Sequence, residues 1–230
     1  MVTQKSLQVA LDFTKLSDAV ELTKKLMSGL EGVEGWFLEA GTPLIKNEGL
    51  KNVIPELRDL VGKDVTIVAD LKTMDAGALE VELAYTVSAD IVGISGAAEE
   101  ETIAAALKKA GELGIGIMID SISVGNINGR LDWILEQLRI FDKKDRISIL
   151  EYHIALDRQS KIRDFTPVKY IHRRCKVPIA VAGGLDENII CDISDYGAAI
   201  FVVGGTIVRP RNRSNEEAIQ AIRKAIYGQK

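Results

Sequence analysis

Charged residues follow an apolar segment in the stretch Val68-Ala-Asp-Leu-Lys-Thr-Met-Asp-Ala-Gly77. Asp70 and Lys72 are two positions apart, so in an extended strand their side chains point to the same side. A lysine ammonium there can stabilise charge that develops on a substrate oxygen, and flanking carboxylates such as Asp75 fix its place and protonation. The alternative is a structural ion-pair network at a strand end. We expect an electrostatic site.

Glu39 ends the preceding apolar segment and can join Asp70 as a hard oxygen ligand. Two carboxylates with substrate oxygens and water are the usual way in which proteins hold Mg²⁺. A lone glutamate after a strand is otherwise a solvated loop residue. We predict a divalent metal at Glu39 and Asp70, either Mg²⁺ or Mn²⁺, because two carboxylates do not distinguish these ions.

The chain has two histidines. His153 ends an apolar segment, and a neutral imidazole at that position can take a proton near neutral pH. The alternative is a hydrogen-bonded core histidine. His172 lies in a helical pattern and is expected at the surface.

Two glycine pairs, Gly183-Gly184 and Gly204-Gly205, end the last two apolar segments. Glycine lets the backbone approach an anion closely, so these pairs predict a phosphate site built from backbone N–H groups. Tight turns use the same pairs. Arg209 follows and either adds charge to this site or is solvated.

These residues need a scaffold that brings strand ends together. Eight short apolar segments rich in Val, Ile and Leu predict strands at Leu7–Leu11, Trp36–Glu39, Val65–Ala69, Ile91–Ile94, Ile115–Ile119, Ile147–Tyr152, Pro178–Ala182 and Ala198–Val203. Apolar residues three to four apart predict helices between and after them, including Leu16–Leu30, Gly49–Val61, Ala76–Val87, Glu100–Leu113 and Asn215–Ile226. The alternation over residues 1–230 predicts one domain, a single (β/α)8 barrel. Asp12 and Asp120 also end strands at the catalytic face.

The composition narrows the class of protein. With 47% hydrophobic residues and a net charge of −4, the chain can bury a core and shows no basic stripe for nucleic acid. No apolar segment approaches the roughly 20 residues that cross a bilayer. Cys175 and Cys191 form no Cys-x-x-Cys motif and are expected to be reduced thiols. We expect a soluble, cytoplasmic protein.

Several sequence motifs, taken in their order along the chain, resemble those of a known superfamily. They are Leu7-Gln-Val-Ala-Leu-Asp12, Glu39-Ala-Gly-Thr-Pro-Leu-Ile45, the Asp70 stretch above, His153-Ile-Ala-Leu-Asp-Arg-Gln159, Val181-Ala-Gly-Gly184 and Val202-Val-Gly-Gly205. Together they resemble the orotidine 5′-monophosphate decarboxylase superfamily, and within it the 3-hexulose-6-phosphate synthase family. The Asp-x-Lys-x-x-Asp core is shared by the whole superfamily. The Lys-Thr-Met-Asp-Ala-Gly and Glu-x-Gly-Thr-Pro-Leu-Ile segments are more specific.

The resemblance implies a metal-dependent aldolase that reversibly adds formaldehyde to D-ribulose 5-phosphate through an enediolate. By the same resemblance the roles are as follows: Glu39 and Asp70 hold Mg²⁺ or Mn²⁺, Lys72 stabilises the enediolate, His153 moves the C1 proton, Asp120 lines the pocket, Asp12 and Asp75 contact substrate hydroxyls, and Gly184, Gly204 and Gly205 receive the phosphate. Asp75 is implied to reach the neighbouring subunit's site, which makes the protein a homodimer with shared active sites.

Other activities stay open. A 3-keto-L-gulonate 6-phosphate decarboxylase makes a similar enediolate, but Leu156, Asp120 and Gly205 stand where that family has Arg, Glu and Arg. An isomerase or epimerase on the same barrel and a catalytically silent barrel are the remaining alternatives. Ala155 and Arg158 depart from the pattern His-x-Gly-x-Asp-x-Gln, which bears on formaldehyde specificity.

Overall fold

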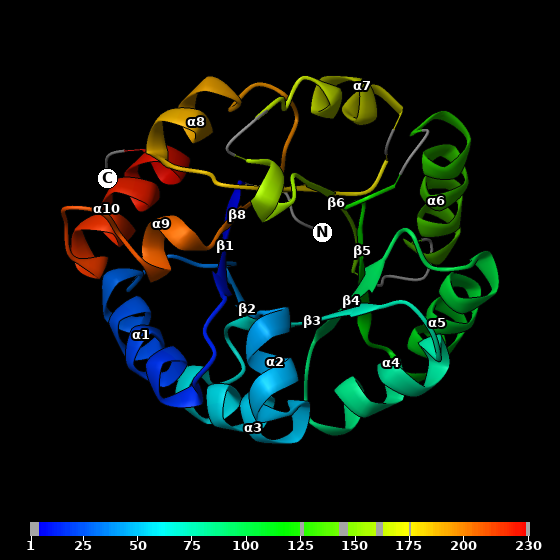
Figure 1. Ribbon diagram of the computed structural model, residues 1–230, viewed down its shortest axis with the longest axis horizontal. Coiled ribbons are helices and arrows are strands. Elements are labelled where there is room, and N and C mark those ends of the chain that lie inside the picture. The colour runs from blue at the N-terminus through cyan, green and yellow to red at the C-terminus, as the bar shows by residue number, and fades with distance from the viewer. Residues whose placement is uncertain (1–4, 125–126, 143–146, 160–162, 175, 229–230) are drawn as a thin grey trace.

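The computed structural model describes residues 5–124, 127–142, 147–159, 163–174 and 176–228. Eight parallel strands lie in chain order and close into a barrel in which β1 pairs with β8 (Figure 1). The strands are β1 (Ser6–Leu11), β2 (Phe37–Ala40), β3 (Thr66–Thr73), β4 (Ile91–Ser95), β5 (Gly116–Asp120), β6 (Ser148–His153), β7 (Ile179–Ala182) and β8 (Ile200–Val203). The predicted fold class, a (β/α)8 barrel, is confirmed.

Helices form an outer ring around the strands (Figure 1). They are α1 (Leu16–Gly29), α2 (Thr42–Glu48), α3 (Leu50–Val61), α4 (Gly77–Thr86), α5 (Glu100–Leu113), α6 (Ile127–Asp142), α7 (Pro167–Arg174), α8 (Glu187–Asp192), α9 (Gly205–Val208) and α10 (Asn215–Tyr227), with a 3₁₀ turn at Leu156–Arg158. Helix α5 has the predicted bounds, because Ile103, Ala106, Leu107 and Ala110 recur at helical spacing and are buried.

Helix α2 was not expected from the sequence. Pro43 lies in its first turn, where a proline needs no N–H partner and its fixed φ suits a helix. Gly49, at φ 83°, then separates α2 from α3. Helix α2 thereby follows β2 directly and lies beside the site.

The interior of the barrel has an apolar lower part and a polar rim. Its apolar part is filled by small and aliphatic side chains with one phenylalanine: Ala10, Phe37, Val68, Ile91, Met118, Ile149, Ala180, Ala182, Ile200 and Val202. Charged side chains that line the cavity above this part include Glu39 on β2, Asp70 and Lys72 on β3, and Glu151 on β6. This division positions the functional groups at one mouth.

Three further expectations concern a membrane span, the two cysteines and His172. Within the described ranges, no helix has both the length and the apolar character needed to span a bilayer. Cys191 is a free, exposed thiol, and Cys175 lies outside the described residues. His172 is exposed on α7, as predicted.

Candidate active site

The carboxyl ends of the strands surround a cavity of about 980 Å³. Its lining includes most of the residues that the sequence predicted to act: Asp12, Glu39, Asp70, Lys72, His153, Gly184, Gly204 and Gly205. Asp120 is buried beneath this lining, with 1% of its surface exposed. Asp75 lies elsewhere and is exposed.

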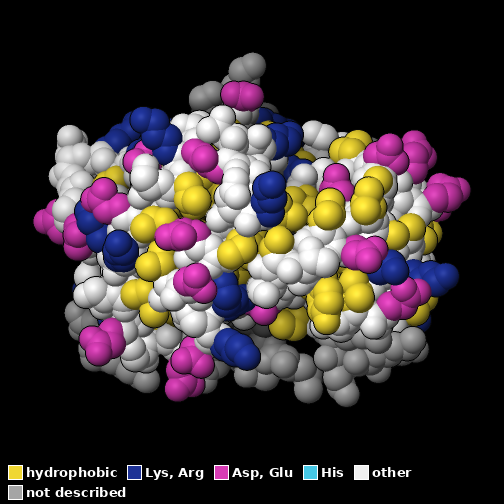
Figure 2. Space-filling model, turned by 90° about the horizontal axis from the view of Figure 1, so that it is seen from below, with side chains coloured by type: hydrophobic (Ala, Val, Ile, Leu, Met, Phe, Trp, Pro, Cys, Tyr) yellow, Lys and Arg dark blue, Asp and Glu magenta, His cyan; other side chains and the backbone are white. Residues whose placement is uncertain are grey.

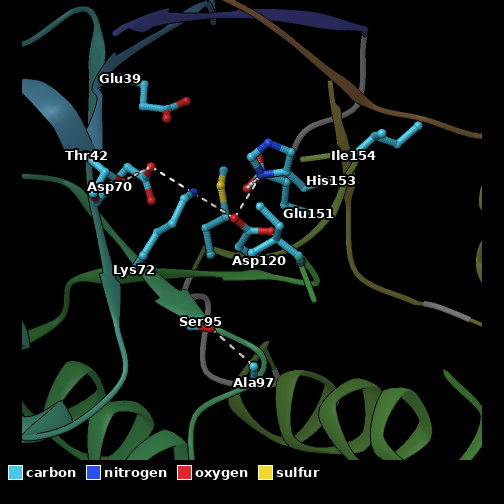
Figure 3. Close-up of polar contacts among 12 residues, drawn as sticks. Glu39, Thr42, Asp70, Lys72, Ser95, Ala97, Asp120, Glu151, His153 and Ile154 are labelled. Atoms are coloured by element: carbon cyan, nitrogen blue, oxygen red, sulfur yellow. Dashed lines mark hydrogen bonds and ion pairs between the residues drawn. The ribbon is translucent and has the colours of Figure 1, made fainter. Parts of the chain in front are cut away.

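The Lys72 ammonium is held between two carboxylates from different strands (Figure 3). Its Nζ donates to Asp70 Oδ2 at 2.9 Å and to Asp120 Oδ2 at 2.7 Å. Burial alone lowers the pKa of Lys72, but the charges of Asp70 and Asp120 outweigh it and raise that pKa. Lys72 is therefore a fixed positive charge at the cavity wall.

The backbone at Lys72 differs from the extended strand expected there. Lys72 has φ 45°, in the left-handed region, and the pairing of β3 with β4 shifts register between Ala69 and Thr73. Such a conformation costs about 1–3 kcal/mol for a residue with a side chain, and strain of this kind clusters at functional sites. The ammonium does meet Asp70, but the left-handed backbone and the register shift place it there rather than strand alternation.

Asp120 also orders the imidazole of His153. His153 Nδ1 lies 2.9 Å from Asp120 Oδ2, the oxygen that Lys72 contacts, and Asp120 Oδ1 accepts from Ile122 N at 2.7 Å. Burial would raise the pKa of Asp120, but the hydrogen bond and charge of His153 and the charge of Lys72 lower it to about 2. Because Asp120 is ionised, Nδ1 is the donor, and in neutral His153 the other nitrogen, Nε2, carries the lone pair.

Glu39 and Asp12 add negative charge to the same cavity. Glu39 is buried and accepts from Gln8 Nε2 at 2.6 Å. Burial, followed by the charges of Asp70 and Glu151, raises the pKa of Glu39 well above its ordinary value. Burial and the charge of Asp70 also raise the pKa of Asp12. The mouth thus carries more carboxyl groups than one ammonium balances.

Glu151 is a cavity residue that the sequence analysis missed. It is buried on β6, lines the cavity, and stands opposite Asp120 in the register of β5 and β6. The signal was present in the sequence, because Glu151 precedes His153 by two positions and strand side chains alternate. Gln8 was missed as well. It is fully buried, and its Oε1 is the one buried side-chain polar atom without a partner among the described residues.

The donor set suits a hard divalent cation. Glu39 and Asp70 come from neighbouring strands β2 and β3, and carboxylate oxygens are the ligands that Mg²⁺ and Mn²⁺ prefer. A cation between them would offset the excess negative charge that raises the pKa of Glu39. The space around Asp70 is kept open by Gly93, where an added Cβ would lie 2.8 Å from Asp70 Oδ1.

Three more ligand atoms come together at the cavity floor. Asp120, Glu151 and His153 each offer one atom, and these atoms lie within 4.8 Å of one another. However, Asp120 Oδ2 already accepts from His153 and from the Lys72 ammonium. The Lys72 ammonium also donates to Asp70 Oδ2, so both sets of carboxylates surround one positive charge, and metal binding by Glu39 and Asp70 stays a prediction.

The opposite side of the cavity is formed by glycines and arginines. Gly183 and Gly184 have φ of 122° and 68°, which other residues rarely adopt. Three arginines that follow β8, namely Arg209, Arg211 and Arg213, also line the cavity. Arg209 donates to the Asp12 carbonyl at 2.9 Å, and Arg213 forms two hydrogen bonds with Glu187. This side is polar and rich in positive charge, as an anionic group requires.

Asp75 lies outside the cavity of its own chain. It is exposed, and its Oδ1 accepts from the adjacent Ala76 N at 2.7 Å. Large apolar side chains are exposed beside it: Met74 is 54% exposed, Leu79 57% and Leu83 48%. Figure 2 shows the side of the barrel on which α4 lies, where hydrophobic side chains interrupt the charged surface.

The segment after β6 carries the two departures from the expected motif. Ala155 has φ −52° and ψ 142°, which any residue adopts, so alanine in place of glycine causes no strain. Arg158 is exposed at the end of the 3₁₀ turn. Gln159 donates to the Ile154 carbonyl at 3.1 Å and faces the cavity.

Comparison with known proteins gives consistent matches over most of the chain. Residues 5–222 match the model of the orotidine 5′-phosphate decarboxylase / HUMPS family. The chain is 34% identical over 202 residues to 3-hexulose-6-phosphate synthase of Mycobacterium gastri, covering 87% of this chain and 90% of that one. A solved structure of a 3-hexulose-6-phosphate synthase shares 32% identity with a TM-score of 0.79, over 96% of this chain and 99% of the other. The 3-keto-L-gulonate-6-phosphate decarboxylase of Vibrio cholerae shares the fold, with 24% identity and a TM-score of 0.75 over 97% of this chain and 98% of the other.

Proposed function

The chain belongs to the orotidine 5′-phosphate decarboxylase / HUMPS family, and we propose that it is an aldehyde-lyase that reversibly joins formaldehyde to D-ribulose 5-phosphate to give 3-hexulose 6-phosphate. The synthase of Mycobacterium gastri, at 34% identity, supports this reaction over the decarboxylase alternative, whose solved example supports the fold. The observation that carries the proposal is the Lys72 ammonium, fixed by Asp70 and Asp120 at the cavity that His153 also faces.

The reaction begins with loss of a proton from C1 of ribulose 5-phosphate. His153 takes that proton on Nε2, because Nδ1 donates to Asp120. The electron pair moves to the C2 oxygen and gives an enediolate, whose negative charge the Lys72 ammonium stabilises. C1 then attacks the formaldehyde carbon, and the new alkoxide takes a proton back from His153. Atoms balance without a further reactant.

A divalent cation, Mg²⁺ or Mn²⁺ held by Glu39 and Asp70, supplies Lewis-acid stabilisation of the substrate oxygens when bound. Asp12 faces the same space and accepts hydrogen bonds from substrate hydroxyls. The phosphate lies at the other side, against the backbone of Gly184, Gly204 and Gly205, near the arginines that follow β8.

We also propose that two copies of the chain share their active sites. Asp75 contributes nothing to its own cavity, yet it lies beside the exposed Met74 and the exposed α4 residues Leu79 and Leu83. A second copy would cover this apolar surface and receive Asp75 at its substrate site. We further propose that residues 1–230 form one catalytic domain and that the protein is cytoplasmic.

The direct test supplies ribulose 5-phosphate, formaldehyde and Mg²⁺ or Mn²⁺, and measures formaldehyde consumption and hexulose phosphate formation. We expect turnover that a chelator abolishes and that either cation restores. Release of CO₂ from 3-keto-L-gulonate 6-phosphate, with no formaldehyde consumed, would instead establish the decarboxylase.

A further inference from the structure

One buried carboxyl group at the cavity, that of Glu151, has no role in the mechanism above. It projects from β6 on the same side as His153, and Asp120 is its register partner on β5 (Figure 3). Ligand atoms of Glu151, Asp120 and His153 lie within 4.8 Å of one another. Glu151 therefore lies against the pair on which proton transfer depends.

The surroundings of Glu151 do not suit a second negative charge. Within the described residues, the basic side-chain atom that lies within 4 Å of its carboxylate is His153 Nδ1, at 3.9 Å, and this nitrogen already donates to Asp120. The other charged groups that face it are Asp120 from β5, Lys72 and Asp70 from β3, and Glu39 from β2. Lys72 is engaged by Asp70 and Asp120.

The proton shared by Glu151 and Asp120 belongs on Glu151. Burial, followed by the charge of Asp120, raises the pKa of Glu151 well above its ordinary value, whereas that of Asp120 is lowered. A hydrogen bond between the two side chains contributes to the raised pKa of Glu151. In such a bond between two carboxyl groups, the protonated one donates.

We propose that Glu151 is a positioning residue, a neutral carboxylic acid that donates a hydrogen bond to Asp120 and thereby keeps His153 neutral with Nε2 open toward the substrate. The hydrogen bond from Glu151 holds Asp120 in place and partly offsets the negative charge of Asp120. An ionised Glu151, or an Asp120 without this donor, would present more negative charge to the imidazole and favour the doubly protonated imidazolium. Imidazolium carries a proton on Nε2 and cannot remove one from the substrate.

This inference rests on the proposed function, but one of its tests does not require turnover. The protein labelled with ¹⁵N at histidine shows two imidazoles, His153 and the exposed His172, and a His172→Gln variant assigns them. The nitrogen chemical shifts distinguish neutral imidazole protonated on Nδ1 from imidazolium. If the enzyme lacked the proposed activity, these spectra would still decide the role of Glu151.

Three variants are compared at neutral pH. Glu151→Gln keeps a donor to Asp120, so we expect the wild-type His153 spectrum and a kcat within about threefold of wild type. Glu151→Leu keeps the volume without the donor, so we expect imidazolium at His153 and a kcat lowered about tenfold or more, with KM little changed. Tyr152→Phe, on the outward side of the same strand, is the control and should behave as wild type.

Two results would overturn the proposal. If Glu151→Gln lost as much activity as Glu151→Leu, the negative charge of Glu151 would be what the enzyme needs, as for a metal ligand. If Glu151→Leu folded with an unchanged His153 spectrum, Glu151 would not act through Asp120. Should the leucine variant fail to fold, Glu151→Gln still tests the proposal, because a large loss of activity or an imidazolium spectrum in that variant would overturn it.

Discussion

Lys72 on β3 and His153 on β6 donate to the same oxygen atom, Oδ2 of Asp120, at 2.7 and 2.9 Å. The group that stabilises charge and the group that moves the proton are therefore held by one buried carboxylate. Since neither can shift without disturbing the other, Asp120 couples the two halves of the proposed chemistry.

Replacing this carboxylate should impair catalysis more than folding. Asp120→Asn keeps the shape, but an amide whose oxygen faces Lys72 and His153 turns its NH₂ group toward the Ile122 N–H, which also needs an acceptor. The amide therefore cannot satisfy all three donors and leaves His153 free to adopt the wrong tautomer. We expect kcat to fall about 10²- to 10⁴-fold, in the range of general acid–base and tautomer effects. Steady-state kinetics measure the loss, and thermal unfolding checks the fold. Near-wild-type turnover would remove Asp120 from the mechanism.

The low pKa of Asp120 also predicts a dependence of stability on acid. Its pKa in the folded protein is about 2, below the ordinary 3.8, so the ionised form stabilises the fold fully above the ordinary value. That contribution is lost as the pH falls from about 4 toward 2. The difference in unfolding free energy between wild type and Asp120→Asn should shrink over this interval in urea titrations. A constant difference would contradict the assignment.

Gly93 should be needed for the position of Asp70. A Cβ at residue 93 would lie 2.8 Å from Asp70 Oδ1 and 3.1 Å from its Cα, and the backbone atom cannot move away easily. We expect Gly93→Ala to cost about 1–3 kcal/mol of stability and to weaken Mn²⁺ binding, measured by calorimetry. Gly129→Ala is the control, because its Cβ would meet no atom within 4 Å.

Gly184 should affect the phosphate end of the substrate. It has φ 68°, and a Cβ there would lie 2.6 Å from Gln159 Oε1. Gly184→Ala is expected to raise KM for ribulose 5-phosphate about tenfold with a smaller effect on kcat, because the backbone must leave its position. Gly32→Ala introduces a similar positive-φ strain in open space and should change stability alone. An unchanged KM in the Gly184 variant would argue against a phosphate at this glycine.

Shared active sites predict complementation between two inactive variants. Lys72→Ala and Asp75→Asn should each be nearly inactive alone. Mixed and allowed to exchange subunits, they form heterodimers in which one of the two sites has both native residues, and roughly a quarter of wild-type activity should return. Mixing two preparations of the same variant is the control. No recovery, with exchange verified by mass spectrometry, would place Asp75 outside the partner's site.

The sequence predicted the scaffold well because buried parallel strands are continuous apolar segments with a distinct length. All eight strands lie where they were expected, and most of the polar residues predicted after them share one mouth, whereas Asp75 lies outside it. Helix α2 was not predicted, because Thr42–Glu48 is too short for a helical period to stand out. The left-handed conformation of Lys72 was not predicted, because no local residue type marks the register shift there.

The candidate site was predicted in part, because polar residues at strand ends are easy to recognise. Strand-end carboxylates such as Glu39 and Asp70 stand out from the apolar residues before them. Glu151 did not stand out, because it lies inside an apolar strand, and its position two residues before His153 was the signal that it faces the barrel interior. That Asp120 joins Lys72 to His153 required coordinates, since the three residues come from β3, β5 and β6.

The left-handed backbone of Lys72 limits how far this enzyme can be made heat-resistant. Glycine at position 72 would relax the backbone, yet it would delete the ammonium. Directed evolution for thermal endurance should therefore leave this position unchanged and accumulate stabilising substitutions on the outer helices, far from the catalytic face.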